Sequence, residues 1–579
     1  MNLPDGEEPT ALDGAWYERQ LARDERRRRG HYVTPPALVA SILNWVGYRS
    51  GADLEHLALL DPACGSGNFL AGAAQVLLAR GRAQGWPSRR TLAALQANLW
   101  GLETDPAACA LAEMRLHALG RALAPGRTLR FHIHQADALA LAAVPGYPIV
   151  VGNPPYLAAR HYDLQAYQRG YRSSGQRDAY LLFLEQACRF VAPDGWLGLV
   201  LPDPVLARGN AADARRLLLE TFTVKRLLHL EGVFRAEVGT LVLIARRAAP
   251  PKQYMIGWGR LDWKRACQDQ DGMAGMFGVE VWRRQPRAEL RYLLGPAEAA
   301  LFERLAREPP SVPLGELARI SRGEELAKGA ALPGAENGAA EGEAALLPVL
   351  RGGLDVRPFR CRFAGFYLRS DQIAKPLERY RAPKLLVVKS TGALCAALDE
   401  RGYVAVQTLY LLHRKTEQVA LEYLLGLLNS RLLRGYLWLH HTAYKLVQPQ
   451  IEQEALARVP VPLAAPDQQR ELAALASQLR ACYAARDGLA VGACAGSPPR
   501  DDERMPQPAQ GVALVVALPP EGASSGAVAT ASPCENEAAW IQLEQTITDL
   551  SARLDASIAA FCGLTADEQA LLAQLPVPG

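Results

Sequence analysis

Short apolar runs alternate with amphipathic helical stretches from about Leu54 to Arg247. This alternation is typical of a doubly wound sheet, in which helices cover mostly parallel strands. No helix fits between the last two runs, so the pattern predicts an antiparallel hairpin at the edge of the sheet. The predicted strands are His56–Leu60, Leu99–Leu102, Leu129–His132, Ile149–Gly152, Leu197–Leu201, Lys225–Leu230 and Thr240–Ala245, and the predicted helices are Gly67–Arg80, Pro106–Gly120, Asp178–Phe190 and Ala211–Thr221.

The pattern changes beyond residue 250. Residues 251–345 show no clear period, and Gly329–Glu343 has the small and polar composition of a flexible loop, so we interpret this stretch as a connecting region. Short apolar runs return in residues 346–465, including Lys384–Val388 and Val404–Leu412, and a helix is expected at Ala420–Leu437. This half of the chain therefore predicts a second domain, of the α+β class.

Two helical patterns follow the second domain. The first covers Pro466–Ala485 within residues 466–493, and the second covers Glu537–Phe561 within residues 536–579. Residues 494–535 between them are rich in Pro, Gly, Ser and Ala, which predicts a disordered low-complexity linker. The apolar positions of the second pattern recur on one helical face, so we expect the two helices to pack against each other.

Composition narrows the class of protein. Of 579 residues, 49% are hydrophobic and 21% are charged, which excludes a wholly disordered or collagen-like chain. No apolar stretch reaches the roughly 18 residues that a spanning helix needs. The ten cysteines form no C-x-x-C pair, so we expect neither a metal site nor a disulfide framework. The acidic start does not resemble a signal peptide, and we expect a cytoplasmic protein that does not bind membranes.

Charge is unevenly distributed along the chain. From Ala495 onward there are three arginines, no lysine and 11 acidic residues, so this part carries −8 and the remainder +12. Residues 1–30 form a basic N-terminal arm with Arg23 and the run Arg26–Arg29. A basic body permits a nucleic-acid partner without proving one, because a charge run is usually a solvated surface.

A glycine-rich turn follows the first predicted strand, in Asp61-Pro-Ala-Cys-Gly-Ser-Gly-Asn-Phe-Leu70. Gly65 and Gly67 allow a tight turn and a close approach of the backbone to a ligand. In a doubly wound sheet this position binds an adenosine-type cofactor, with Asp61 and Ala63 in the same turn. A glycine turn alone is weak evidence, since it can serve only to pack a helix on a strand.

Acidic residues follow the second and third predicted strands. Glu103 ends the second strand, where a carboxylate commonly accepts hydrogen bonds from ribose hydroxyls. Asp105 precedes Pro106 and suits a helix N-cap better. Asp137 follows the third strand and could accept a hydrogen bond from an adenine amino group, although a turn cap explains it almost as well.

The sequence Val151-Gly-Asn-Pro-Pro-Tyr156 follows the fourth predicted strand. Two consecutive prolines restrict the backbone, so Asn153 projects from a rigid turn, and Tyr156 offers a flat aromatic face. The combination with residues 61–70 indicates a catalytic site rather than a structural turn.

These motifs, in this order, resemble the gamma class of DNA amino-methyltransferases, typified by TaqI-like N6-adenine-specific enzymes of restriction-modification systems. Gly30-His-Tyr-Val-Thr-Pro-Pro36 resembles the first cofactor motif of that family, with His31 and Val33 as departures, and Gly195–Pro202 resembles its fifth-strand motif. The segments Tyr380–Val388, Gly402–Thr408, Leu424–Ser430 and Leu446–Gln450 resemble its target-recognition domain, and Ala559–Glu568 resembles the terminal helix of related enzymes.

The resemblance implies a Rossmann-like S-adenosylmethionine-dependent methyltransferase domain at residues 31–250, an α+β target-recognition domain at 346–465 and C-terminal helices. It implies methylation of a flipped adenine in double-stranded DNA, which would place the protein at the nucleoid, and a separate nuclease or defence subunit as a partner. The implied catalytic residues are Asn153, Pro154, Pro155 and Tyr156, with Tyr156 and Phe234 stacking on the base. The cofactor would be bound by Tyr32, Thr34, Pro35, Asp61, Ala63, Gly65, Gly67, Glu103 and Asp137. Candidates for DNA binding are Arg379, Arg381, Lys384 and Lys389, from a basic stretch around Tyr380.

Three alternatives stay open at this point. The same chemistry on the cytosine amino group differs only in the target base. A protein-glutamine methyltransferase shares Asn-Pro-Pro-Tyr but lacks a large recognition domain. A non-catalytic recognition subunit would not need intact cofactor motifs. Without a family resemblance, Phe234 could equally be a core residue.

Overall fold

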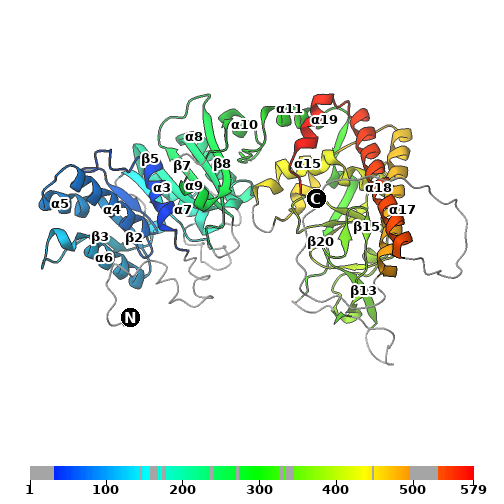
Figure 1. The fold of residues 1–579 in the computed structure, drawn as a ribbon, viewed down its shortest axis with the longest axis horizontal. Helices are drawn as coiled ribbons and strands as arrows, with labels where there is room; N and C mark the ends of the chain where they lie inside the picture. The colour runs from blue at the N-terminus through cyan, green and yellow to red at the C-terminus, as the bar shows by residue number, and fades with distance from the viewer. Residues whose placement is uncertain are drawn as a thin grey trace, which may run out of the picture. The chain divides into compact units, whose positions relative to one another are not determined.

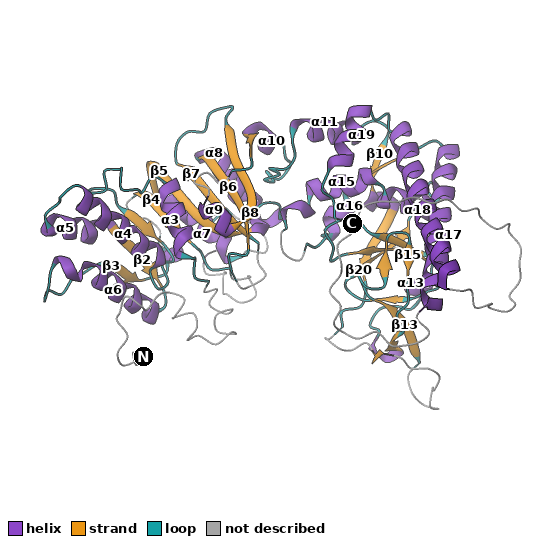
Figure 2. Ribbon diagram, in the orientation of Figure 1, coloured by secondary structure: helices purple, strands orange, loops and turns teal. Residues whose placement is uncertain are grey.

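Nine strands form one mixed sheet in the first of two compact units of the computed structural model (Figures 1 and 2). The structure describes residues 32–578 apart from 142–145, 157–166, 168–169, 173–177, 235–238, 269–272, 327–331, 334–344, 446–448 and 494–532. The basic arm at 1–30 and most of the expected linker therefore lie outside the described residues. The first unit comprises the chain up to Gly295 together with Tyr444–Val447, and the second comprises the rest.

The sheet of the first unit has the strand order β3-β2-β1-β4-β5-β7-β6-β8-β9. Its strands are β1 (Leu59–Asp61), β2 (Leu99–Glu103), β3 (His132–Gln135), β4 (Tyr147–Gly152), β5 (Val191–Pro202), β6 (Thr223–Glu231), β7 (Thr240–Arg246), β8 (Met255–Asp262) and β9 (Gly275–Gly278). Its helices are α3 (Pro36–Trp45), α4 (Asn68–Ala83), α5 (Ser88–Asn98), α6 (Pro106–Gly120), α7 (Ala179–Phe190), α8 (Ala212–Thr221), α9 (Trp263–Gln268) and α10 (Val279–Arg283).

The order in which strands are added to the sheet reverses between β1 and β4, although the two strands are parallel. Strands β1, β2 and β3 follow one another outward on one side, and β4 and β5 extend the sheet on the other side, all in parallel. Because crossovers between parallel strands are right-handed, helices α4 and α6 cover one face and α7 covers the other. The carboxyl ends of β1 and β4 therefore flank a crevice, which is where doubly wound sheets bind ligands.

The sequence predictions for this unit are confirmed with four corrections. The first strand covers Leu59–Asp61 and begins three residues later than predicted. The third strand begins at His132, not at Leu129, because Leu129 and Phe131 are buried in the core while the edge strand itself is half-exposed. The expected hairpin is present as β6 and β7, but it is not at the edge, since β8 pairs with β6 and β9 pairs with β8. The sheet therefore continues past residue 250, where the sequence placed its end. Exposed Met255 and Met276 obscure the apolar pattern of these added strands.

The second unit combines small sheets with a helical layer. Its larger sheets have the orders β11-β20-β17-β18 and β12-β16-β13-β19. Its strands are β10 (Ser311–Pro313), β11 (Ala318–Arg322), β12 (Leu332–Pro333), β13 (Leu346–Leu350), β14 (Val356–Arg357), β15 (Arg360–Cys361), β16 (Phe366–Arg369), β17 (Lys384–Val388), β18 (Ala396–Asp399), β19 (Val404–Ala405), β20 (Leu409–Arg414) and β21 (Pro460–Pro462). Its helices are α11 (Pro296–Leu305), α12 (Leu314–Leu317), α13 (Glu378–Arg381), α14 (Leu421–Asn429), α15 (Arg431–His440), α16 (Gln453–Ala457), α17 (Pro466–Ala493), α18 (Pro533–Phe561) and α19 (Ala566–Gln574).

The helix expected at Ala420–Leu437 is two helices. Ser430 between α14 and α15 has an extended backbone, and its hydroxyl accepts a hydrogen bond from Leu433 N at 3.3 Å as the N-cap of α15. Serine can interrupt a helix through such side-chain hydrogen bonds. The helical spacing of apolar residues continues across Ser430, so the sequence pattern predicts one helix.

The expected pairing of the two C-terminal helices is confirmed. Helices α17 and α18 pack along each other (orange and red in Figure 1), with Leu475 and Leu479 on one and Leu550 and Leu554 on the other all buried. These leucines are thus covered within the second unit, whereas Trp540 and Ile541 near the start of α18 are exposed.

A fully buried ion pair holds β17 to β18. Lys384 Nζ lies 2.6 Å from Asp399 Oδ2 and also donates to the Tyr380 carbonyl. Asp399 accepts three further hydrogen bonds from the backbone of Arg401, Gly402 and Tyr403. The expectation that Lys384 contacts DNA is therefore wrong, because this ammonium is enclosed in the core.

We expect Lys384→Met to lower the free energy of unfolding of the second unit by about 3–5 kcal/mol, because it strands a buried carboxylate. Denaturant titration followed by hydrogen exchange in β17 measures this. Arg381→Met, at an exposed position of the same basic stretch, should leave stability unchanged. Equal stability of both variants would contradict a structural role for Lys384.

Candidate functional site

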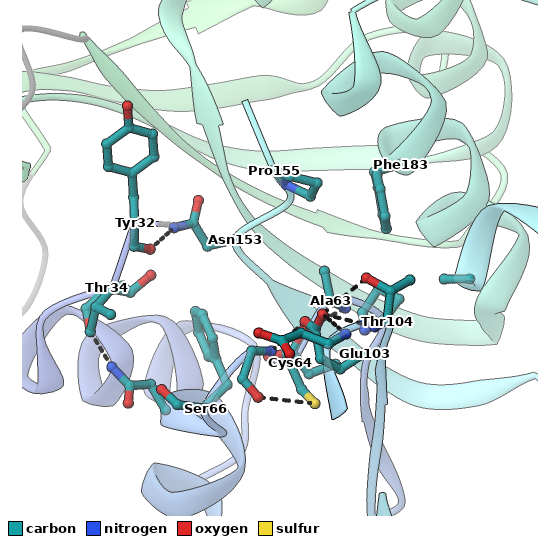
Figure 3. Close-up of a pocket in the computed structure, with 18 of the residues that line it drawn as sticks. Tyr32, Thr34, Ala63, Cys64, Ser66, Glu103, Thr104, Asn153, Pro155 and Phe183 are labelled. Atoms are coloured by element: carbon teal, nitrogen blue, oxygen red, sulfur yellow. Dashed lines mark hydrogen bonds between the residues drawn. The ribbon is translucent and has the colours of Figure 1, made fainter. Parts of the chain in front are cut away.

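A cavity of about 460 Å³ opens at the carboxyl edge of the first sheet, next to the ends of β1, β2 and β4 (Figure 3). This volume falls within the roughly 300–1,000 Å³ of small-molecule sites. Its lining brings together most of the residues that the sequence singled out. From that set the cavity is lined by Tyr32, Thr34, Asp61, Ala63, Gly65, Glu103, Asp137, Asn153 and Pro155.

The glycine turn between β1 and α4 shapes one wall. Gly65 and Gly67 have φ angles of 53° and 81°, in the left-handed region that other residues avoid. A Cβ at Gly67 would lie 2.9 Å from the Cβ of Ala112 on α6. Gly67 does not line the cavity, so in this structure it serves close packing of α4 on α6, and Gly65 alone presents its backbone to the cavity.

Glu103 at the end of β2 fixes the turn from the opposite side. One carboxylate oxygen accepts from Gly65 N at 3.0 Å, and the other accepts from Thr104 N at 2.8 Å and Asp105 N at 2.9 Å. Glu103 still lines the cavity and remains only half-buried. Its carboxylate is thus held rigidly by backbone amides with accepting capacity toward the cavity.

Two further carboxylates contribute to this wall. Asp105 is the N-cap of α6, as the sequence indicates, through a hydrogen bond from Ala107 N at 3.1 Å. Asp137 Oδ1 caps the next turn by accepting from Leu139 N at 2.9 Å, and its Oδ2 accepts from the Tyr167 hydroxyl. The turn-cap explanation for Asp137 is therefore confirmed. Its side chain also lines the cavity, and a hydrogen bond to an adenine amino group stays a prediction.

Asp61 lies at the base of the cavity and is almost fully buried. Its Oδ1 accepts from Ala63 N at 3.1 Å. Burial raises the pKa of Asp61 to about 8, with a smaller contribution from the nearby charge of Glu103. Below that pH the group is mainly protonated, and a cation placed in the cavity would favour its ionised form.

The chain before α3 lines the cavity and is held in place by two asparagines. Asn68 Nδ2 donates to the Thr34 carbonyl at 3.0 Å, and Asn153 Nδ2 donates to the Tyr32 carbonyl at 2.7 Å (Figure 3). Arg115 in turn holds Asn68 Oδ1 at 2.7 Å. Pro35 is the N-cap of α3 and does not line the cavity. The first cofactor motif is thus brought beside the turn after β4, 121 residues away.

The side-chain oxygen of Asn153 is the most informative atom of the site. Asn153 Oδ1 is buried and accepts no hydrogen bond within the described part of the chain. A buried carbonyl oxygen without a donor costs about 1–3 kcal/mol, and such groups mark places where a ligand completes the structure. Because Nδ2 is engaged by Tyr32, the amide orientation leaves Oδ1 as an acceptor for an incoming N–H or O–H group.

Three aromatic rings gather next to Asn153. Tyr32 lies 5.9 Å from Tyr156 and 5.6 Å from Phe234, and Tyr156 lies 6.1 Å from Phe234, as ring-centroid distances. The structure therefore brings Phe234 next to the Asn-Pro-Pro-Tyr turn. Phe234 is the last described residue before the gap at 235–238. Flat apolar faces around a polar acceptor suit a planar ring that carries an amino group.

Sequence reasoning missed several lining residues. Phe69, Phe183 and Ala179 supply apolar walls, and Phe183 faces the cavity from α7 (Figure 3). Phe69 belongs to the motif already singled out, but Phe183 sits in a helix whose residues are nearly all buried. The sequence alone does not distinguish an apolar residue of such a helix that lines a cavity from one that packs in the core.

The remaining DNA-binding candidates lie in the second unit. Arg379 Nη2 donates to Ser321 Oγ at 2.7 Å and to the Arg322 carbonyl at 2.9 Å, so it supports the neighbouring loop. Arg381 is exposed, and Lys389 is half-buried at the carboxyl end of β17. Within the described ranges no cluster of three or more His, Cys, Asp or Glu residues could hold a metal ion, and no helix has the length and hydrophobicity to cross a membrane.

Comparisons with known proteins agree with this geometry. Residues 14–255 match the family model described as N-6 DNA Methylase, and residues 347–461 match the TaqI-like C-terminal specificity domain. Type II methyltransferase M.BstVI of Geobacillus stearothermophilus is 26% identical over 227 residues, which cover 37% of this chain and 40% of that protein. Type II methyltransferase M.PaeR7I of Pseudomonas aeruginosa is 28% identical over 218 residues, covering 34% and 36%. The match thus spans less than half the length of these relatives.

Two solved structures resemble the chain in fold. The type IIL restriction-modification enzyme MmeI, solved in complex with DNA, has a TM-score of 0.57 at 11% identity and covers 97% of this chain and 80% of its own. The DrdV–DNA complex has a TM-score of 0.54 at 13% identity and covers 82% of this chain and 59% of its own. The predicted α/β methyltransferase fold with a second domain is confirmed. Residues 14–255 are similar to the N-6 DNA methylases, and residues 347–461 are similar to the TaqI-like specificity domains.

Proposed function

We propose that this protein transfers a methyl group from S-adenosylmethionine to the exocyclic N6 amino group of a specific adenine in double-stranded DNA. The observation that carries the proposal is the buried Asn153 Oδ1, which has no donor among the described residues and lies beside the cavity and the aromatic rings. The proposed function accounts for the position of this acceptor at the same sheet edge as the cavity.

The residues of the cavity fit the cofactor. Backbone at Gly65 permits close approach, the rigid carboxylate of Glu103 can accept from ribose hydroxyls, and buried Asp61 can face a positive charge. S-adenosylmethionine supplies an activated methyl group on its sulfonium, so the protein mainly has to align donor and acceptor.

Asn153 would activate and orient the acceptor. The adenine amino nitrogen is a poor nucleophile because its lone pair is delocalised into the ring. Hydrogen bonds from this amine to Asn153 Oδ1 and to the Pro154 carbonyl would favour a pyramidal nitrogen whose lone pair points at the methyl group. The 2.7 Å bond from Asn153 Nδ2 to Tyr32 prevents the amide from turning its nitrogen toward the amine.

The aromatic rings would hold the base outside the duplex. A base inside a DNA helix cannot reach the cavity, so the target must be flipped out, at a cost of a few kcal/mol. The faces of Tyr156 and Phe234 would recover part of this cost by stacking. The proposal extends to a restriction-modification or phage-defence setting, in which a separate nuclease would cut unmethylated DNA.

We expect Asn153→Ala to lower methyl transfer to DNA by about 100- to 1,000-fold, as for removal of one preorganised polar group at a reacting centre. Incorporation of labelled methyl groups into duplex DNA measures this, and nucleoside analysis identifies the base. Asn44→Ala, at an exposed position of α3, is the control. Wild-type rates in Asn153→Ala, or methylcytosine as the product, would refute the adenine assignment.

Glu103→Gln should weaken cofactor binding by about 1–1.5 kcal/mol, which is the difference between a hydrogen bond to a charged acceptor and one to a neutral acceptor. Isothermal titration with S-adenosylhomocysteine measures the change. Glu113→Gln, exposed on α6, should bind normally. Unchanged affinity in Glu103→Gln would place the ribose elsewhere.

Cofactor binding should release a proton from Asp61. Its pKa of about 8 in the free protein means that Asp61 is mainly protonated at pH 6.5, and the positive charge of the bound cofactor should lower this pKa and favour the carboxylate. Titration of S-adenosylmethionine at pH 6.5 in two buffers of different ionisation enthalpy counts the protons. We expect the wild type to release protons on binding, so its affinity for the cofactor should increase as the pH rises. Asp61→Asn should release none. Equal numbers of protons released by the wild type and by Asp61→Asn would show that Asp61 does not respond to the charge of the cofactor.

A further inference from the structure

Three polar side chains meet at one end of the sheet β11-β20-β17 in the second unit. Arg322 ends β11, Lys389 follows β17, and Gln407 precedes β20. Because both outer strands run antiparallel to β20, these three positions fall at the same edge. Backbone hydrogen bonds tie them together, from Gly323 N to Leu409 O at 3.1 Å, from Lys389 N to Thr408 O at 2.9 Å and from Gln407 N to Glu324 O at 2.7 Å. We refer to Arg322, Lys389 and Gln407 as the strand-end cluster.

The strand-end cluster carries an excess of positive charge. Partial burial and the charge of Arg322 lower the pKa of Lys389, and Glu325 opposes this to a lesser extent. None of the ion pairs found in the described part of the chain includes Arg322 or Lys389, and the Arg322 guanidinium donates a hydrogen bond to the Tyr410 hydroxyl. Two cations held near each other repel, so an acceptor-rich ligand would relieve the repulsion.

The loop beneath the cluster is built rigidly. Glu324 is buried and accepts from the Tyr380 hydroxyl at 2.7 Å, from Lys375 N at 3.2 Å and from Ala374 N at 3.3 Å. A Cβ at Gly323 would lie 2.3 Å from two carbonyl oxygens, those of Ala405 and Val406. Flexible lysines suffice for phosphate contacts, whereas reading a base edge needs side chains placed on a fixed frame.

We propose that the strand-end cluster reads base edges of the target DNA in the major groove, with Arg322 bound to O6 and N7 of a guanine. Arginine offers two parallel donors that match these two acceptors, and Lys389 adds a third donor beside them. Gln407 can pair with an adjacent adenine through N6 and N7. This inference rests on the proposed function and deepens it by naming the residues that select the site.

The test compares the sequence preference of full-length wild type, Arg322→Ala and Gln407→Ala. Each protein methylates a random-sequence plasmid library, and single-molecule sequencing maps every modified adenine. We expect the wild-type motif to contain a guanine at a fixed position. In Arg322→Ala, discrimination at that guanine should fall by about 10- to 100-fold while methylation of sites lacking it becomes detectable. Gln407→Ala should relax a different position.

Two controls separate this role from others. Arg319→Ala removes an exposed cation from the same strand at the opposite pleat face, and should keep the wild-type motif. Arg322→Lys should retain partial preference for guanine, because the ammonium still donates to O6 or N7 but lacks the planar pair of donors that a guanidinium offers. Thermal melting checks that each variant is folded.

The outcomes separate two kinds of failure. A uniform loss of methylation over all sequences in Arg322→Ala, with an unchanged motif, would show a phosphate contact and overturn the assignment. A wild-type motif without guanine would overturn it as well. Absence of methylation by the wild type itself would instead refute the proposed function.

Discussion

The hydrogen bond from Asn153 to the Tyr32 carbonyl is the constraint on which the site depends. It joins the segment before α3 to the turn after β4, and it decides which end of the asparagine amide faces the cavity. With the nitrogen engaged, the oxygen is left buried with no donor in the part of the chain that the structure describes. One interaction therefore joins two parts of the cavity lining and orients the acceptor that the proposed chemistry requires.

The topology of the sheet makes this interaction possible. Because the strand order reverses between β1 and β4, the turns after these strands diverge to opposite faces and leave a crevice between them. The glycine turn and Glu103 line one side of the crevice, and the Asn-Pro-Pro-Tyr turn lines the other. Parallel packing of β1 and β4 thus sets the separation of the two turns that line the cavity.

The second unit shows how similar residues divide between core and surface. Lys384 and Lys389 flank the same strand, yet the first is paired with Asp399 in the core and the second emerges at the strand end. Glu324 is likewise buried, and its carboxylate stabilises a loop by accepting a hydrogen bond from the Tyr380 hydroxyl. Buried charges of this kind stabilise the frame from which exposed cations project.

The sequence by itself determined the α/β class, the order of the strands along the chain and the motifs that line the cavity. It did so because these depend on local periodicity and on residues such as Gly65 and the Pro154–Pro155 pair, whose backbone preferences act wherever they are placed. The resemblance to a known family directed attention to Phe234, and the rings of Tyr32 and Tyr156 lie beside it.

Only the tertiary structure decided which of two lysines is buried, that the sheet extends past residue 250 and that Ser430 divides a helix. It also decided that Gly67 packs on α6 and that Phe183 forms a wall of the cavity. These outcomes depend on partners far away in the chain, such as Asp399 for Lys384 and Ala112 for Gly67. A pattern of neighbouring residues contains no record of such partners, because burial is a property of the packed chain and not of the residue.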